Sequence, residues 1–272
     1  MDVKTLSAKA KDIRIDILTE VHAANSGHPG GSLSAADIMT VLFFDEMRID
    51  PADPKKPDRD KFVLSKGHAA PALYAAMAER GFFPKEELIT LRKLGSRLQG
   101  HPSIKKLPGI EMSTGSLGQG ISSAVGMALA AKLNKEDRRI YTLLGDGELQ
   151  EGMVWEAAMS AGHYKLDNLC AIVDHNGLQI DGKNDDVMCV MPVAEKFKAF
   201  GWNVIKTNGH DMESIMKAFA LARACKGLPT VIVAETVKGK GVSFMENDPG
   251  WHGKAPDDEQ FAQAMKELGG EF

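Results

Sequence analysis

The sequence predicts an α/β protein: a doubly wound, mostly parallel sheet with helices on both faces. Segments with the apolar spacing of amphipathic helices alternate with short apolar segments, an order typical of parallel strands joined by helices. The short segments are apolar throughout rather than at every second residue, as expected of strands buried on both faces. Glycine-rich residues follow several of them, and ligands of such sheets bind beyond the carboxyl ends of the strands.

The amino-terminal elements follow from spacing and from residues that break helices. Apolar residues recur at spacings of three and four in residues 4–21, which predicts an amphipathic helix. Residues 24–33 contain too much glycine and proline for a regular element, so we expect a loop there. Ser34 is placed to cap a helix over 35–45. Residues 50–60 are rich in proline and charge and predict a surface loop.

The rest of the chain continues the alternation of strands and helices. Strands are predicted at 62–64, 140–144, 169–174, 202–206 and 229–234. Helices are predicted at 70–80, 85–93, 119–133, 151–161, 192–200, 211–225 and 257–268. The helix over 119–133 is rich in small residues, which favours close packing, and carries one apolar stripe of Ile121, Val125, Leu129 and Leu133.

Composition limits the class of protein. No repeat, low-complexity tract or linker divides the 272 residues, so we predict one domain over 1–272. The net charge of −4 argues against nucleic acid as a partner. The three cysteines lie far apart, which suits a reducing compartment. No apolar run reaches the ~18 residues of a membrane span, and no signal peptide is evident, so we expect a cytoplasmic protein.

An aspartate between two glycines follows the strand at 140–144, and Asn176 follows the strand at 169–174. Glycine lets the backbone approach a ligand closely, and Asp146 offers the hard oxygen that Mg²⁺ prefers. With the backbone carbonyl of Leu178, these two side chains could supply three ligands beside a diphosphate. The equally weighted alternative is an Asp in a tight turn and an Asn in a hairpin-like bend.

Histidines gather in the irregular segments. Five of the eight follow a glycine directly, and His163 and His210 among them have a structural explanation at predicted helix ends. The others in loops are His28, His68, His101 and His252. Each alone is more simply a surface loop residue, yet four together favour an active site.

The segment Lys238-Gly-Lys240-Gly is compatible with a phosphate-binding loop and equally with a solvated turn. No Walker motif, dinucleotide-binding fingerprint or nucleophile elbow occurs elsewhere in the chain.

Six motifs resemble those of transketolase, in order and spacing, over nearly the whole chain. They are Ser26-Gly-His28-Pro-Gly, Ser65-Lys-Gly-His68, Gly100-His101-Pro, Thr114-Gly-Ser-Leu-Gly-Gln-Gly120, Gly145-Asp-Gly-Glu-Leu-Gln-Glu-Gly152 and Ile180-Asp-Gly182. Asp146 and Asn176, about thirty residues apart, also resemble the general thiamine diphosphate motif. Two departures are His175, where that motif often has a second Asn, and Ser116, where many relatives have Pro.

The resemblance implies a cofactor site for thiamine diphosphate and a divalent metal. Asp146, Asn176 and the Leu178 carbonyl would hold Mg²⁺, for which Ca²⁺ can substitute in the family. The implied cofactor contacts are Gly147, His68 and His252 at the diphosphate, Leu117 and Ile180 at the rings, Gly115 with the adjacent Ser116 near the aminopyrimidine, and Lys238.

The resemblance also implies how the sugar is handled. His28, His101 and His252 would line the channel, bind sugar hydroxyls and move protons. Glu151 and Glu156 would belong to a carboxylate network that links paired active sites. The expected reaction moves a two-carbon ketol unit from a ketose phosphate to an aldose phosphate.

The chain is less than half as long as a full transketolase. The pyrimidine and C-terminal domains are absent, and with them the Glu that activates the cofactor and most residues that hold the sugar phosphate. We therefore expect the N-terminal subunit of a split transketolase, active with a C-terminal subunit in a heterotetramer of two pairs. Alternatives are a subunit of a related enzyme, acting on a branched sugar or making deoxyxylulose phosphate, and a non-catalytic cofactor-binding module.

Overall fold

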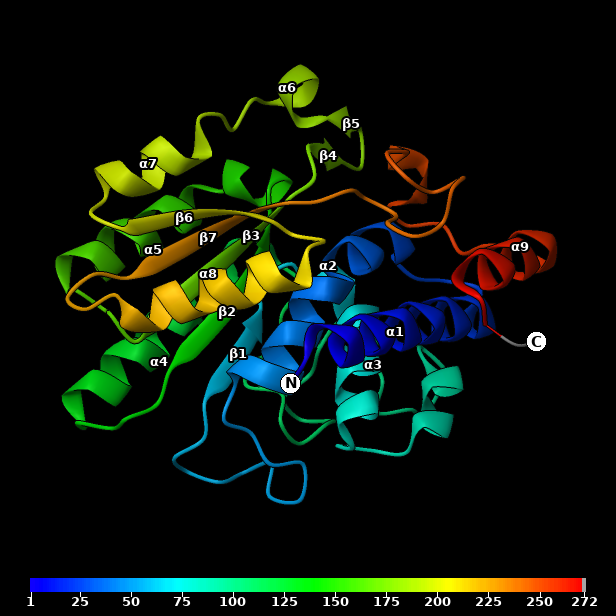
Figure 1. Cartoon of the computed structure of the whole chain (residues 1–272), viewed down its shortest axis with the longest axis horizontal. Coiled ribbons are helices and arrows are strands. Elements are labelled where there is room, and N and C mark those ends of the chain that lie inside the picture. The colour runs from blue at the N-terminus through cyan, green and yellow to red at the C-terminus, as the bar shows by residue number, and fades with distance from the viewer. Residues whose placement is uncertain (271–272) are drawn as a thin grey trace.

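A computed structural model describes residues 1–270; Glu271 and Phe272, the end of the predicted domain, lie outside the described residues. Its centre is a five-stranded parallel sheet in the order β1-β2-β3-β7-β6 (Figure 1). The strands are β1 Lys61–Leu64, β2 Ile140–Gly145, β3 Leu169–His175, β6 Asn203–Asn208 and β7 Thr230–Glu235. The predicted fold class is confirmed.

Helices cover both faces of this sheet, because side chains along each strand alternate between two cores. In β3, Cys170 and Ile172 face one core, whereas Leu169, Ala171 and Val173 face the other. The first core contains residues of α1 Val3–Ala24, α2 Pro29–Val41, α3 Ala70–Arg80 and α8 Met212–Ala224. The second contains residues of α4 Gln119–Leu133, α5 Gly152–His163 and α7 Val193–Ala199.

The last helix, α9 Asp258–Leu268, packs against α1 and begins with a capping box between Asp257 and Gln260 (Figure 1). None of the helices within residues 1–270 combines the length and the apolar character needed to cross a bilayer.

The parallel register brings the ends of β2 and β3 together. Gly145, the last residue of β2, pairs with Asp174 in β3. Asp146 and Asn176 therefore emerge side by side at the carboxyl edge of the sheet. A two-stranded hairpin of β4 Leu178–Gln179 and β5 Gly182–Lys183 follows at the same edge, with the short α6 Asn184–Val187 (Figure 1).

The loop predicted over 24–33 is limited to residues 25–28, and the predicted cap at Ser34 is wrong, because α2 already begins at Pro29. Proline suits the first turn of a helix, where its missing N–H is not needed. The glycines allow close packing within the helix: a Cβ on Gly30 would come 2.9 Å from the Trp251 carbonyl oxygen. Local composition predicted a loop where tertiary contacts demand small helical residues.

Three further differences concern short or terminal segments. The helix predicted over 85–93 is a 3₁₀ turn, Lys85–Thr90. The hairpin and α6 were not predicted, because segments of two to four residues carry too little periodicity. Leu133 does not share the buried stripe of α4 but is 73% exposed at the end of that helix.

Two glycines in neighbouring helices should respond in opposite ways to replacement by alanine. A Cβ on Gly162 in α5 would overlap the Phe200 carbonyl oxygen, whereas a Cβ on Gly126 in α4 meets nothing within 4 Å. We expect Gly162→Ala to lower the free energy of unfolding by about 1–3 kcal/mol. Gly126→Ala should raise it by about 0.5–1 kcal/mol. Urea denaturation of both variants measures this, and equal effects would contradict the packing at Gly162.

Candidate active site

Asp146 lies directly after β2 and is 2% exposed. Its Oδ1 accepts a hydrogen bond from the Gly147 N–H at 2.8 Å, and its Oδ2 accepts one from the Gly177 N–H at 2.5 Å. Burial raises the pKa of Asp146, and the negative charge of Asp174 raises it further. No Lys, Arg or His within residues 1–270 forms an ion pair with Asp146. A bound cation could therefore take the place of the ion-pair partner that Asp146 lacks among these residues.

Neutral oxygens surround this carboxylate. The Asn176 Oδ1 accepts from the Leu178 N–H at 3.1 Å, and the Leu178 carbonyl accepts from Lys238 Nζ at 3.3 Å. The Asn184 side chain is buried near Gly147, and its amide lies close enough to Asp146 to act against the rise in the pKa of that carboxyl. One carboxylate among amide and carbonyl oxygens fits the preference of Mg²⁺ for few protein ligands plus phosphate and water.

Few side chains that could bind a metal ion directly lie in this site. Within residues 1–270, no group of three or more His, Cys, Asp or Glu side chains could hold a metal ion. A metal would thus depend on Asp146, on neutral oxygens and on oxygens of a ligand. The residues present fit a metal that arrives together with a diphosphate.

A buried ion pair between Lys66 and Asp174 lies beside these oxygens. Lys66 is 1% exposed and Asp174 is 0% exposed. Lys66 Nζ also donates to the Gly31 carbonyl at 2.7 Å, and Asp174 accepts from the hydroxyls of Ser34 and Thr236. Burial acts to raise the pKa of Asp174, but the Lys66 charge and these hydrogen bonds hold it below its usual value.

Glu148 forms a second buried anchor that the sequence reasoning did not assign. Its Oε1 accepts from the Ser65 hydroxyl and from the Gly118 N–H at 2.8 Å, and its Oε2 accepts from the Gly145 N–H at 3.0 Å. It thereby ties the ends of β1 and β2 to the loop before α4. The signal in the sequence was its position directly after Gly145-Asp146-Gly147, at the end of a predicted strand.

The four loop histidines come together at the same edge. The ring centroids of His28 lie 5.4 Å from those of His68 and His252 and 6.2 Å from that of His101. The rings of His68 and His252 are 4.9 Å apart. Residues that are more than 200 positions apart in the chain thus form one cluster.

These histidines are neutral near pH 7. Burial lowers the pKa of His252 to about 3, and the nearby charge of Lys238 contributes. Burial and the charge of Arg92 lower the pKa of His28 to about 4. The pKa values of His68 and His101 are also lowered, mainly by burial. A neutral imidazole has one donor and one acceptor nitrogen. In His28 and His252 the acceptor Nδ1 faces Arg92 Nη2 and Lys238 Nζ, which leaves the Nε2–H of each ring to donate to a hydroxyl.

Lys238 joins the two groups of residues. Besides the Leu178 carbonyl, its Nζ contacts His252 Nδ1 at 3.1 Å. Burial lowers the pKa of Lys238 to about 8, and the charge of Lys66 adds to this effect. A buried ammonium of this kind is suited to an anionic ligand group.

A cavity of about 180 Å³ runs between these residues. Ten of the predicted site residues line it: His68, Leu117, Asp146, Gly147, Glu151, Asn176, Leu178, Ile180, Lys238 and His252. The other four lie outside its lining. Of these, His28 and His101 belong to the adjoining histidine cluster, and a Cβ on Gly115 would come 3.2 Å from the His101 ring. Ser116 is exposed, as is the predicted network residue Glu156.

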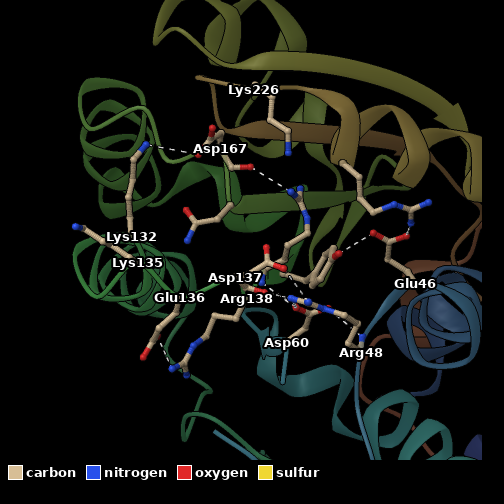
Figure 2. A pocket seen from close by; sticks show the side chains of 14 residues that line it. Glu46, Arg48, Asp60, Lys132, Lys135, Glu136, Asp137, Arg138, Asp167 and Lys226 are labelled. Carbon is tan, nitrogen blue, oxygen red and sulfur yellow. Dashed lines mark hydrogen bonds and ion pairs between the residues drawn. The ribbon is translucent and has the colours of Figure 1, made fainter. Parts of the chain in front are cut away.

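A larger cleft of about 550 Å³ opens at the opposite, amino-terminal edge of the sheet (Figure 2). Its charged side chains largely pair with one another: Arg48 with Asp60 and Asp137, and Arg223 with Glu46. It contains no histidine and none of the predicted site residues. The smaller cavity at the carboxyl edge is therefore the candidate active site.

Replacing Glu148 by Gln should destabilise the protein. Gln offers one acceptor oxygen, so its amide N–H₂ would face donors that now bind a carboxylate. We expect a loss of about 2–3 kcal/mol in the free energy of unfolding. The exposed Glu151→Gln should stay within about 0.5 kcal/mol of the parent. Urea denaturation separates the two, and a Glu148→Gln variant as stable as Glu151→Gln would refute the anchoring role.

Stability should fall on acidification through His28 and His252. An unfolded histidine titrates near pH ~6.5, whereas the folded pKa values are about 4 and about 3. Between these limits the unfolded chain binds more protons, so stability present above pH ~6.5 is lost as the pH falls.

The measurement is the free energy of unfolding at several pH values from 7.5 to 5. The double variant His28→Gln/His252→Gln should lose less stability over this range than the parent. The exposed His163→Gln should leave the pH dependence unchanged. Parallel curves for the double variant and the parent would show that these two rings are not the cause.

Known proteins resemble this chain in sequence and in fold. The family model "Transketolase, thiamine diphosphate binding domain" matches residues 5–272. The chain is 45% identical over 268 residues to a subunit of the apulose-4-phosphate transketolase of Phocaeicola vulgatus, covering 98% of this chain and 95% of that protein. It is also 45% identical over 263 residues to 6-deoxy-6-sulfo-D-fructose transketolase subunit SqwG of a Clostridium species, covering 97% and 96%.

Full-length transketolases match over less of their own length. Human transketolase is 46% identical over 270 residues, which cover 98% of this chain but 42% of that protein. The crystal structure of transketolase from Campylobacter jejuni superposes with a TM-score of 0.94 at 37% identity, over 100% of this chain and 44% of that one. From its family match, its relatives and its fold, this chain belongs to the transketolase family and contains the family's thiamine diphosphate-binding domain.

Proposed function

We propose that this chain binds thiamine diphosphate with Mg²⁺ and, with a partner chain, transfers a two-carbon ketol unit from a ketose phosphate to an aldose phosphate. The observation that carries the proposal is that Asp146, Asn176 and Leu178 share one cavity with His68 and His252, and that His28 and His101 adjoin these two histidines. The first group suits a metal–diphosphate, and the second suits sugar hydroxyls.

Each residue of this chain has a part in that proposal. Asp146, Asn176 and Leu178 hold the metal, which Ca²⁺ could replace, while Gly147, His68 and Lys238 bind the diphosphate. Leu117 and Ile180 pack against the cofactor rings, and Gly115 with Ser116 borders the aminopyrimidine. Thiamine diphosphate, when bound, would act as the electron sink that stabilises negative charge on the donor's former carbonyl carbon when the carbon–carbon bond breaks.

The histidines handle the sugar. The Nδ1 atoms of His28 and His252 already face the donors of Arg92 and Lys238, so each ring donates to a hydroxyl through its Nε2–H. His101 can donate to a hydroxyl or accept from one, and all three rings can pass protons. The partial burial of His28 and His252 also keeps bulk water away from the reacting carbons. Glu151 and Glu156, on the exposed start of α5, would connect this site to a second one in the assembly.

A partner chain completes the enzyme in this proposal. The chain spans less than half of the full-length relatives named above, and two relatives of similar length are named subunits. The partner would supply the pyrimidine and C-terminal domains, giving a cytoplasmic heterotetramer of two pairs in which residues 1–272 act as one domain. The exposed Ile180 next to the cavity is a surface on which such a partner could close.

A second candidate function is supported by the same relatives. Those that match over their full length are named for apulose 4-phosphate and 6-deoxy-6-sulfo-D-fructose. A transfer on a branched or sulfonated sugar is therefore the alternative to transfer between unbranched sugar phosphates. Both candidates use the same cofactor site and differ in the sugar alone.

Asp146→Ala should abolish metal-dependent cofactor binding, because the only carboxylate of the proposed metal site is lost. Calorimetric titration with thiamine diphosphate, in the presence and absence of Mg²⁺, measures the binding of the cofactor. Asp181→Ala removes an exposed carboxylate of the neighbouring hairpin and should bind like the parent. If the Asp146→Ala variant binds the cofactor as tightly as the parent does in the presence of Mg²⁺, the assignment of Asp146 as a metal ligand is wrong.

Ketol transfer should require the partner. The purified chain alone should show no transfer, and the complex purified from native extract should be active with the cofactor and Mg²⁺. Activity is followed by product formation from a ketose phosphate and an aldose phosphate. Robust transfer by the isolated chain would contradict the two-chain proposal.

A further inference from the structure

Arg92 lies beside the histidine cluster and takes no part in the proposal above. Its Nη1 donates to the Ser26 hydroxyl at 3.1 Å, and its Nη2 lies 3.4 Å from His28 Nδ1. Arg92 is exposed, as is His101, whereas His28, His68 and His252 are partly buried. The guanidinium therefore stands at the solvent side of the cluster, where a sugar chain would enter.

The loop that carries Arg92 holds it in a strained conformation. Arg92 has a φ of 60°, in the left-handed region that residues with a Cβ rarely adopt. Its N–H donates to the Leu98 carbonyl at 2.9 Å, and the hydroxyls of Thr90 and Ser96 bond across the loop at 2.8 Å. Such strain persists only where surrounding contacts impose it, and it is found most often at functional sites.

Gly100 makes room for this side chain. A Cβ at Gly100 would come 3.0 Å from the Arg92 guanidinium carbon. Tyr74 fixes the segment that contains Gly100, because its hydroxyl donates to the Gln99 carbonyl at 2.8 Å. The segment that delivers His101 is thus shaped to accept the Arg92 guanidinium next to it.

The charge of Arg92 is not balanced locally. Among residues 1–270, no Asp or Glu forms an ion pair with it, in contrast to Arg97 on the same loop, which pairs with Glu87 at 2.7 Å. Its neighbours in the site are histidines that carry no charge near pH 7. Of its five N–H groups, at least three remain for a ligand after the contacts to Ser26 and His28.

We propose that Arg92 binds the anionic end of the sugar substrate and sets a preference for charged over neutral sugars. The inference rests on the proposed ketol transfer and deepens it. A planar guanidinium with free N–H groups binds the oxygens of a phosphate or a sulfonate through two parallel hydrogen bonds. The partner chain would supply further contacts to this group, and Arg92 is the contact that this chain contributes.

The test compares Arg92→Gln and Arg92→Lys with the parent in the complete complex with its partner chain. For each, kcat/KM is measured with three donors: a ketose phosphate, a ketose sulfonate and the corresponding unmodified ketose. We expect Arg92→Gln to lower kcat/KM for the charged donors by about 10- to 100-fold, mainly through KM. The unmodified ketose should change by less than about threefold, and Arg92→Lys should restore part of the loss.

Lys93→Gln is the matched control, because it removes the same charge from the adjacent exposed residue. It should leave the ratio between charged and neutral donors unchanged. Thiamine diphosphate binding should be the same in all variants, which shows that the cavity is intact. A loss for the phosphate alone or for the sulfonate alone would identify which anion the site reads.

The outcomes separate the two proposals. If the parent complex transfers no ketol unit from any donor, the proposed function fails. If the parent is active and Arg92→Gln lowers activity equally on charged and neutral donors, the role of Arg92 as an anion contact is overturned. An equal change in Lys93→Gln would overturn it as well, because any surface charge would then suffice.

Discussion

The buried pair of Lys66 and Asp174 is the constraint on which the site depends. The two residues are 108 positions apart, yet their bond joins the end of β1 to the end of β3. Through Gly31, Ser34 and Thr236 the same pair also holds α2 and the residue after β7. Removing one partner from such a pair costs about 3–5 kcal/mol. Asp146 and Asn176 keep their positions because this network fixes the strand ends beneath them.

Electrostatics divide the site into two parts with different tasks. Asp146 is a buried carboxylate with no ion-pair partner in residues 1–270, which favours a bound cation. Around His28 and His252, burial and the charges of Arg92 and Lys238 lower the pKa values of the two imidazoles, so both rings stay neutral near pH 7. A ligand that combines a metal-bound diphosphate with a hydroxyl-rich sugar would match both parts. The division follows from which strand end or loop each residue occupies.

Much of the fold and the location of the site could be predicted from the sequence, because both depend on local patterns. Apolar strands ending in Asp146 and Asn176 had to meet at one edge once the sheet was parallel. The start of α2 could not be predicted, since its glycines serve packing against Trp251 rather than a turn. Glu148 and Lys66 act through contacts distant in sequence, which leave no periodic signal. The pairing of Arg92 with His28 is of the same kind.

Side chains along each strand alternate between the two cores, so the number of residues in each strand is critical. In β3, successive residues belong to two separate cores, and Asp174 ends this series opposite Gly145. One inserted residue would exchange the side chains of both cores and turn Asp174 away from Lys66. An insertion in the largely exposed loop over 50–59, before β1, would disturb neither core. Natural variation in chain length should therefore collect at the amino-terminal edge of the sheet, while the carboxyl edge keeps its spacing residue for residue.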